Sequence, residues 1–384
     1  HLDRVPKKYE GQDGTELAIS ESQERMAVVV APGDVAAFVA AAAAENLEAT
    51  AIADVTETGR LRMTWRGETI VDLDRAFLDT HGVRLRASAR ITAPDTRRVY
   101  PATFSGRGEL ASDLRASWLA ALRDLNVCSR KGLVERFDST VGAGSVLHPF
   151  GGARRQTPAD VMVATIPDLE REAVTATAMS WGFDPELACR SPFHAALHAV
   201  VHAVTRLVAA GVDPRTVRLT LQEYFERLRD EPARWGKPVA ALLGALTAQL
   251  ELGVAAVGGK DSMSGSFNDL DVPPTLVAFA IGVIDADAVV TPELKQAGSR
   301  LFLLQPERED DGRPEWESLR ALHEDVAIAA RDRRIRSAVA IGHGGLAVAL
   351  SRAALGNRVG VVFENAYAHL DLFAADYGAV CVET

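Results

Sequence analysis

The sequence predicts an α/β or α+β fold with mixed rather than purely parallel sheets. Short apolar runs of strand type alternate with helical patterns along the 384 residues. A strand–helix–strand order also occurs twice with similar content, at 26–55 and at 358–382. This length exceeds one typical domain, so we expect two or three domains that bury substantial cores.

Charge and cysteine usage exclude several classes of protein. The formal net charge of −10 argues against a nucleic-acid coat protein, although it leaves room for a local basic pocket. The three cysteines, Cys128, Cys189 and Cys381, are widely spaced and form neither a metal motif nor a disulfide framework, which favours a reducing, cytoplasmic setting. No apolar run reaches membrane length and no signal peptide is visible, so we expect neither membrane nor nucleic acid as a partner.

The first part of the chain, residues 16–83, is predicted to be a compact α/β unit. Its expected elements are a buried strand at 26–31, an alanine-rich helix from Pro32 to about Glu45, a second strand at 49–55, and a hairpin of 61–65 with 68–72 around Arg66 and Gly67. The polar string Ser-Glu-Ser-Gln-Glu-Arg-Met at 20–26 precedes the first strand. Taken alone, it indicates only a solvated strand entry.

A connector at 84–121 leads to the rest of the chain, which again alternates strands with helices. Helices are expected at 113–125, shortly after Ser129, and at 192–210, 239–250, 316–334, 346–354 and 366–375. Strands are expected at 141–147, 161–166, 217–221, 252–257, 275–284, 299–304, 338–343, 358–363 and 379–382.

Three histidines lie near one face of the helix at 192–210. His194, His198 and His202 follow each other at intervals of four residues, and two histidines at that spacing can bind zinc. No acidic residue lies between them, however, and no fourth ligand is apparent. A partly buried or solvated helix face is therefore the favoured interpretation.

The most informative stretch is a glycine-rich turn between two apolar runs, Gly-Gly-Lys-Asp-Ser-Met-Ser-Gly-Ser-Phe at 258–267. Glycines let a backbone approach an anion closely, and successive backbone N–H groups can cradle phosphate oxygens. Lys260 adds a positive charge, and Asp261 offers oxygen ligands for magnesium. The spacing is not that of a Walker loop, and a plain polar hairpin is the competing interpretation.

Longer strings carry a resemblance to a known family. The strings at 20–26, 136–146, 219–225, 234–238 and 258–277 together resemble phosphoribosylformylglycinamidine synthase, in its large single-chain form. The resemblance implies duplicated halves with domains like those of aminoimidazole ribonucleotide (AIR) synthetase. It divides the chain into the C-terminal part of a first half at 1–85, a connector at 86–121, a second N-terminal domain at 122–286 and an incomplete second C-terminal domain at 287–384. The chain begins with His1 and stops at Thr384 directly after an apolar run, so we expect a piece of a longer protein.

The resemblance also implies a reaction. Such an enzyme is an ATP- and glutamine-dependent ligase of purine biosynthesis, which converts formylglycinamide ribonucleotide to formylglycinamidine ribonucleotide through an iminophosphate. ATP and Mg²⁺ are the implied cofactors, and ammonia comes from a glutaminase domain or subunit. The catalytic histidine and the glutaminase cysteine of the family are expected outside this chain.

Several residues acquire expected roles in this way. Substrate binding is expected at Glu21, Ser22, Gln23 and Ser262, ATP phosphate binding at Gly258, Gly259 and Lys260, and magnesium at Asp160 and Asp261. Gln222 and Glu223 are further candidates for the active cleft.

Two departures from the family pattern put an ancillary nucleotide site of the second half in doubt. His202 stands where the family usually has a glutamate, and the turn at 340–343 before Gly344 lacks a carboxylate. Two alternatives therefore stay open: another ATP-using enzyme of the AIR synthetase type, or a non-catalytic scaffold half that docks a glutaminase.

Overall fold

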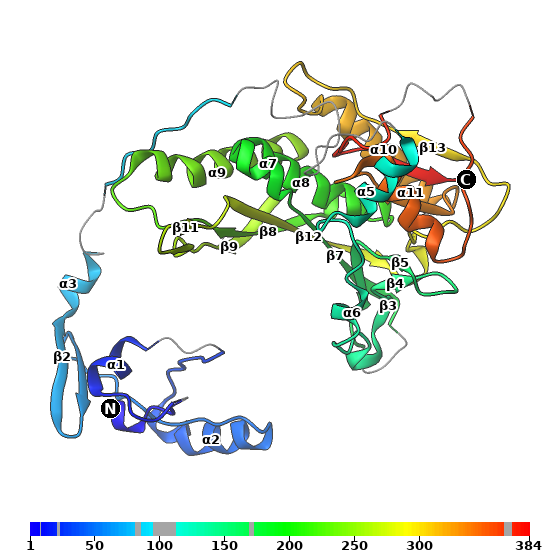
Figure 1. The fold of residues 1–384 in the computed structure, drawn as a ribbon. Coiled ribbons are helices and arrows are strands. Elements are labelled where there is room, and N and C mark those ends of the chain that lie inside the picture. Colours follow the sequence, from blue (N-terminus) through cyan, green and yellow to red (C-terminus); the bar gives the residue numbers. More distant parts are fainter. Residues whose placement is uncertain (8, 21–23, 81–85, 95–112, 169–172, 365–370) are drawn as a thin grey trace. The chain divides into compact units, whose positions relative to one another are not determined.

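The chain forms two compact units, His1–Arg86 and Ala87–Thr384, each described by itself below (Figure 1). The structure is a computed structural model, and it describes all residues except 8, 21–23, 81–85, 95–112, 169–172 and 365–370. The finer division of the chain at 121 and 286 stays a prediction, because residues 87–384 cluster as one unit.

The described residues of the first unit form a β-hairpin and three α-helices. The hairpin pairs β1 (Arg60–Trp65) with β2 (Glu68–Asp74), as expected from the sequence. Its two turn residues, Arg66 and Gly67, both have positive φ, which matches the twist of a two-residue hairpin loop. The α-helices are α1 (Gly14–Ile19), the expected alanine-rich α2 (Val35–Ala44) and α3 (Arg75–Asp79).

The two strands expected at 26–31 and 49–55 of this unit do not form, so this part of the prediction is wrong. Both segments run as irregular chain, and the side chains of Met26, Val29 and Val55 are at least 80% exposed. An apolar run becomes a strand only when a neighbouring backbone completes its hydrogen bonds, and none of the described residues does so here. The strand expected at 358–363, in the second copy of the strand–helix–strand pattern, does not form either, because this segment is also irregular.

The second unit is built on a six-stranded sheet with the strand order β3-β6-β7-β12-β8-β9. Its strands are β3 (Ser145–Leu147), β6 (Val161–Thr165), β7 (Thr175–Gly182), β12 (Thr275–Asp285), β8 (Arg218–Tyr224) and β9 (Ala255–Lys260). All neighbours pair antiparallel except β8 and β9, which are parallel. The mixed sheet expected from the sequence is therefore confirmed.

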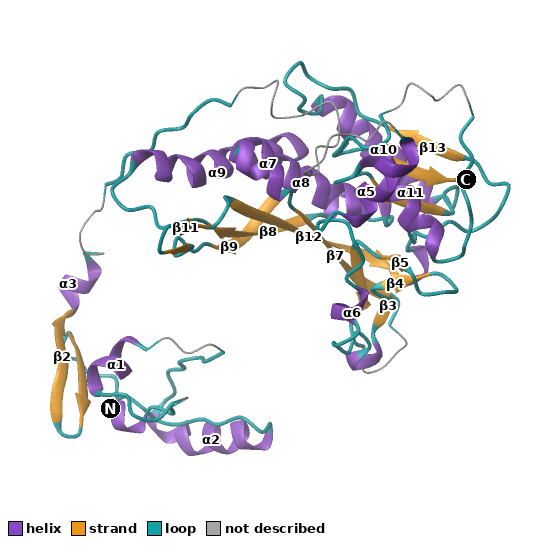
Figure 2. Ribbon diagram, viewed as in Figure 1, coloured by secondary structure: helices purple, strands orange, loops and turns teal. Residues whose placement is uncertain are grey.

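Two long helices, α8 (Pro192–Ala209) and α9 (Pro232–Leu252), cover one face of this sheet (Figure 2). Every residue of α8 from His194 to Ala209 is buried, because the helix packs between the sheet and α9. Two glycines allow this close approach. A Cβ on Gly182 of β7 would lie 2.0 Å from the Ala199 carbonyl oxygen, and one on Gly244 of α9 would lie 2.0 Å from that of Phe193.

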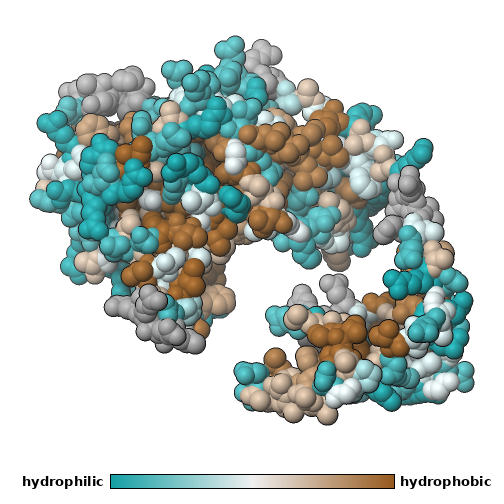
Figure 3. Space-filling model, turned by 180° about the vertical axis from the view of Figure 1, so that it is seen from behind, coloured by the Kyte–Doolittle hydropathy of each residue, from teal (hydrophilic) through white to brown (hydrophobic). Residues whose placement is uncertain are grey.

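The opposite face of the sheet carries apolar side chains that remain accessible. Met179 and Trp181 of β7 and Ile281 and Val283 of β12 are between 37% and 52% exposed. Figure 3 shows apolar residues reaching the surface of this unit. Within the described chain, no helix reaches the combination of length and apolar character that a membrane span requires.

A second, three-stranded sheet follows, with β15 (Val380–Glu383) between β13 (Leu301–Leu304) and β14 (Ser337–Ala340). The helices α10 (Trp316–Arg331) and α11 (Gly345–Leu355) accompany it, close to their expected positions. A helix expected at 366–375 lies partly outside the described residues, and 371–375 is not helical.

Candidate functional site

The 258–267 loop leaves the sheet where two parallel strands end side by side. β8 and β9 run in the same direction, with Leu221 opposite Gly259 and Gln222 opposite Lys260. The glycine pair therefore belongs to β9 itself rather than to the turn, which begins only at Asp261. This differs from the expected turn at Gly258, because the ladder to β8 extends through both glycines.

Backbone hydrogen bonds fix the loop against the chain that follows β8. The Ser262 N–H donates to the Glu223 carbonyl at 3.2 Å, and the Phe225 N–H donates to the Ser262 carbonyl at 2.9 Å. The Gly265 N–H then donates to the Phe225 carbonyl at 2.9 Å. These hydrogen bonds continue the sheet edge into the turn, so the side chains of the turn project from an ordered backbone.

A short hairpin completes the loop. It pairs β10 (Ser266–Phe267) with β11 (Leu270–Asp271), and Asp271 is held by the Arg234 guanidinium at 2.7 Å and by the Ser266 hydroxyl at 2.6 Å. This ion pair joins the hairpin to the first turn of α9. The 258–267 loop is consequently anchored on both sides.

The expected phosphate-binding residues lie together and are accessible. Gly258, Gly259, Lys260 and Asp261 are exposed, and Ser262 is half-buried. The Ser262 hydroxyl lies 2.8 Å from that of Ser264. The loop therefore offers a positive charge, hydroxyl groups and a backbone without Cβ atoms at one strand end, which is the chemistry that an anion requires.

Glu223 adds a buried acid beneath this surface. Its side chain at the end of β8 is 6% exposed, and its Oε1 atom has no hydrogen-bond partner within the described residues. Burial, together with the nearby Asp261 carboxylate, raises its pKa to about 7. A carboxyl group with that pKa can exchange a proton at neutral pH, which is typical of functional sites. Its neighbour Gln222 donates its amide to the Lys260 carbonyl at 3.2 Å.

The expected substrate-binding residues Glu21, Ser22 and Gln23 lie outside the described residues. Their role stays a prediction from the sequence.

Asp160, an expected magnesium ligand, has a cation of the protein itself beside it. Its Oδ1 lies 3.6 Å from Nη2 of Arg206, a buried residue of α8. The guanidinium also stacks over Trp181, 4.4 Å from the ring centroid. Asp160, Arg206 and Ala340 line a small hollow between β6, α8 and β14. Arg206 carries the charge that compensates Asp160, so no magnesium ion is needed to neutralise this carboxylate.

The three histidines of α8 are buried rather than solvated. His194 Nδ1 lies 2.7 Å from the Ser191 hydroxyl that caps the helix. The rings of His198 and His202 pack against Tyr377, with centroids 5.3 and 5.1 Å away. Burial lowers the pKa of His198 and His202 well below the ordinary value, so both are neutral at pH 7. They form core packing in the described structure, and no metal-binding group includes them.

The sequence did not reveal a second cluster of polar residues around His343. This residue follows β14, in the turn where the family pattern has an acidic group, and it lies near Asp124, Asp184 and Glu186. The unusual Gly-His-Gly-Gly turn at 342–345 was the available signal. Its carboxylate partners come from distant parts of the sequence, so only the fold brings them together.

Comparisons with known proteins agree with the resemblance found in the sequence. Residues 1–66 match the family model described as AIR synthase related protein, C-terminal domain. The phosphoribosylformylglycinamidine synthase subunit PurL of a Nocardioides species is 29% identical over 99% of this chain and 51% of its own length. That of Mycolicibacterium vanbaalenii is 28% identical over the same shares. The chain thus spans about half the length of these curated relatives.

Solved structures show the same fold. The structure of PurLQS from Thermotoga maritima superposes with a TM-score of 0.67 and 19% identity, and covers all of this chain and 56% of that one. T. maritima PurL complexed with FGAR superposes with a TM-score of 0.67 at 19% identity, and the match covers all of this chain and 54% of that one. T. maritima PurL complexed with ATP superposes with a TM-score of 0.64 at 18% identity, and the match covers all of this chain and 56% of that one. The relatives are described as a subunit, whereas the sequence motifs led us to expect the large single-chain form.

Proposed function

We propose that this chain, which is similar along nearly its whole length to the phosphoribosylformylglycinamidine synthase subunit PurL, forms part of an ATP-dependent carbon–nitrogen ligase of purine biosynthesis. The proposed substrate is formylglycinamide ribonucleotide, and the proposed nitrogen donor is ammonia that a glutaminase releases from glutamine. The observation that carries the proposal is the 258–267 loop, which presents phosphate-binding chemistry on a backbone fixed to the sheet edge.

The proposed reaction has two steps. The amide oxygen of the substrate attacks the γ-phosphorus of ATP, ADP leaves, and an iminophosphate forms. Ammonia then attacks the amide carbon, and the carbon–oxygen bond breaks as phosphate departs. Phosphoryl transfer depends mainly on positioning and on neutralising negative charge.

The chain's own residues supply those needs in the proposal. Gly258 and Gly259 let the nucleotide phosphates approach the backbone of β9, and Lys260 neutralises phosphate charge. Ser262 contacts the substrate phosphate or amide. Glu223, whose pKa is about 7, exchanges a proton beside the reacting groups. Glu21, Ser22 and Gln23 are further substrate-binding residues of the proposal, on the basis of the sequence resemblance alone.

Mg²⁺ fits one of the two expected positions. Asp261 and the buried Glu223 are close enough for the charge of one to raise the pKa of the other, and a divalent cation would relieve that repulsion. When bound, the ion would neutralise phosphate charge next to Lys260. Asp160 fits less well, because Arg206 already lies against its carboxylate.

The setting we propose is the cytoplasm, with the glutaminase supplied by a separate domain or subunit. Support comes from the cysteines, since Cys128, Cys189 and Cys381 are all free thiols.

A reconstituted assay tests the proposal. The chain is co-expressed with a matching first N-terminal domain and a glutaminase, and glutamine- and ATP-dependent amidine formation is measured. We expect Lys260→Ala and Ser262→Ala to reduce kcat/KM by at least about tenfold, since a charge-assisted hydrogen bond contributes about 1.5–3 kcal/mol. Gln23→Ala should lower it as well, and Lys260→Arg should restore part of the activity.

Arg333→Ala serves as the matched control, because this exposed cation follows α10 and pairs with Asp287, and its removal should leave kcat/KM unchanged. Wild-type activity in Lys260→Ala and Ser262→Ala would remove the loop from the site and contradict the proposal.

A second candidate function is a non-catalytic scaffold half that docks a glutaminase. The observation in its favour is the Asp160–Arg206 pair, because a cation of the protein lies against an expected magnesium ligand. Equilibrium dialysis of the chain with labelled ATP separates the two: a pure scaffold should bind none, whereas the 258–267 loop predicts binding that weakens in Lys260→Ala.

A further inference from the structure

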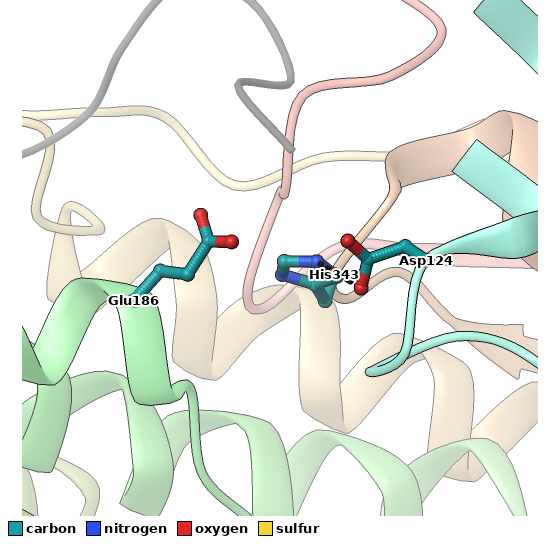
Figure 4. Close-up of side chains that lie close together, drawn as sticks. All are labelled: Asp124, Glu186 and His343. Atoms are coloured by element: carbon teal, nitrogen blue, oxygen red, sulfur yellow. Dashed lines mark ion pairs between the residues drawn. The ribbon is translucent and has the colours of Figure 1, made fainter. Parts of the chain in front are cut away.

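Three potential metal ligands converge near the β14–α11 turn, away from the 258–267 loop in sequence. Asp124 ends α5 (Leu114–Arg123), Glu186 lies in α7 (Pro185–Arg190) and His343 precedes α11. One ligand atom from each lies within 4.8 Å of the others. Figure 4 shows the His343 ring between the two carboxylates. Among the described residues, this is the one group of three or more such side chains.

The turn that carries His343 has little freedom. Gly344 and Gly345 both have positive φ, at 81° and 66°, where a side chain would be strained. A Cβ on Gly342 would lie 2.8 Å from Nε2 of the buried His202. The imidazole is therefore presented from a backbone that is fixed by packing on both sides.

A neighbouring carboxylate orients the imidazole. Asp184 Oδ2 lies 3.9 Å from His343 Nδ1, whereas Nε2 faces Asp124 Oδ1 at 3.6 Å. Asp184 is itself held, because its Oδ1 accepts the N–H groups of Glu186 and Leu187 at 2.9 Å and its Oδ2 accepts the Tyr377 hydroxyl at 2.5 Å. Histidines that bind metals commonly turn their other ring nitrogen toward such a carboxylate.

The spacing suits a small divalent ion. A nitrogen and an oxygen that each lie about 2.1 Å from a metal and 3.6 Å from each other subtend an angle of about 120°, near tetrahedral. No direct hydrogen bond spans the 3.6 Å between Nε2 and Oδ1. Glu186 forms an ion pair with Arg190 along α7 at 3.6 Å, and its second carboxylate oxygen remains for a bound ion.

We propose that Asp124, Glu186 and His343 bind one divalent transition-metal ion of the zinc type, with Asp184 orienting the histidine. One imidazole and two carboxylates favour zinc over magnesium, which prefers oxygen ligands alone. Such an ion would link three segments that lie far apart in the sequence. It would stabilise the second unit, because a ligand that binds only the folded state raises the free energy of unfolding.

Zinc titration of the full chain tests this site without any assay of the ligase. After removal of metals with a chelator, calorimetric titration with Zn²⁺ at pH 7.5 should show one equivalent bound. His343→Ala and Asp124→Asn should each weaken binding at least tenfold, and Asp184→Asn should weaken it by about 10- to 100-fold. Zinc should also raise the Tm of the wild-type chain but not that of His343→Ala.

Matched controls remove exposed histidines elsewhere. His148→Ala and His1→Ala should leave the affinity unchanged, and His1 is an informative choice because it lies 3.1 Å from Asp54 and forms a surface pair of its own. If His343→Ala fails to fold, as circular dichroism would show, Glu186→Gln takes its place, since that residue lies at the edge of the cluster.

The competing explanation is a plain ion-pair cluster. Although burial alone would lower it, the carboxylates of Asp184, Glu186 and Asp124 raise the pKa of His343 above its ordinary value. An imidazolium in such a cluster would bind no zinc. Absence of stoichiometric binding, or an equal affinity in His343→Ala and wild type, would overturn the proposal.

Discussion

Glu223 shows what burial does to a single carboxyl group. It lies under the 258–267 loop, 6% exposed, with Asp261 nearby, and its pKa is raised to about 7. Because this value lies above the ordinary 4.5, the folded chain binds the proton more tightly than the unfolded chain does. The stability that the group contributes is therefore complete below pH 4.5 and is lost as pH rises through 7.

We predict that Glu223→Gln flattens this pH dependence. Wild type should lose up to about 3 kcal/mol of unfolding free energy between pH 5 and pH 8, since each pKa unit corresponds to about 1.4 kcal/mol. The unfolding free energy of Glu223→Gln should stay more nearly constant over this pH range, because the variant lacks the titrating group. Urea denaturation at several pH values measures both proteins. Glu324→Gln, at an exposed position, is the control, and an equal pH profile in wild type and Glu223→Gln would contradict the burial argument.

Ser262 and Glu223 also mark what a sequence can reveal about single residues. The resemblance of the strings around them to the family made both residues candidates for the site. The burial of Glu223 was not predictable, since it depends on how the loop folds over the end of β8. His343 was missed for the same reason: its partners Asp124 and Asp184 meet it only through the tertiary fold.

At the scale of one element, β9 depends on two adjacent glycines in different ways. A Cβ on Gly259 would lie 2.5 Å from the Leu221 carbonyl oxygen of β8, whereas a Cβ on Gly258 would have no heavy atom within 4 Å. Both glycines are exposed, so burial does not separate them. The difference lies in the close approach of the two strand backbones.

We predict that Gly259→Ala destabilises the chain by about 1–3 kcal/mol, because the strand must move away from β8 to admit the methyl group. Gly258→Ala should change stability by less than about 0.5 kcal/mol and serves as the matched variant. Urea denaturation of both proteins measures the difference. Equal stability of the two variants would show that the β8–β9 edge yields without cost.

Elements with local signals were the ones that the sequence predicted well. α8 begins at the Ser191 cap with Pro192 behind it and ends before Gly211, and each of these signals is local. The strands expected at 26–31, 49–55 and 358–363 had the right composition, but no backbone among the described residues pairs with them. A strand is a property of two segments, so one segment alone predicts it poorly.

At the scale of the whole molecule, the two units differ in how much they bury. The first unit contributes only Leu2 and Leu17 to the buried apolar side chains of the described structure, and α2 buries none of its residues. The second unit has a continuous core in which α8 is almost wholly enclosed. Their stabilities should therefore differ strongly.

We predict that amide hydrogen exchange separates the units. Amides of α8 should exchange about a thousandfold or more slowly than those of α2, since the former open only with the core and the latter are exposed. Mass spectrometry of deuterated peptides measures both helices in one sample. Comparable protection of α2 would mean that another surface covers this helix in solution.

The order of strands in the small sheet bears on how the chain is made. The outer strands β13 and β14 are complete by Ala340, but the central strand that joins them, β15, begins only at Val380. At ribosomal speeds of about 5–20 residues per second, β14 waits about 2–8 s for β15, and β13 waits about 4–15 s. During synthesis, the edges of β13 and β14 that later pair with β15 therefore stay open until the last residues of this sheet have been made.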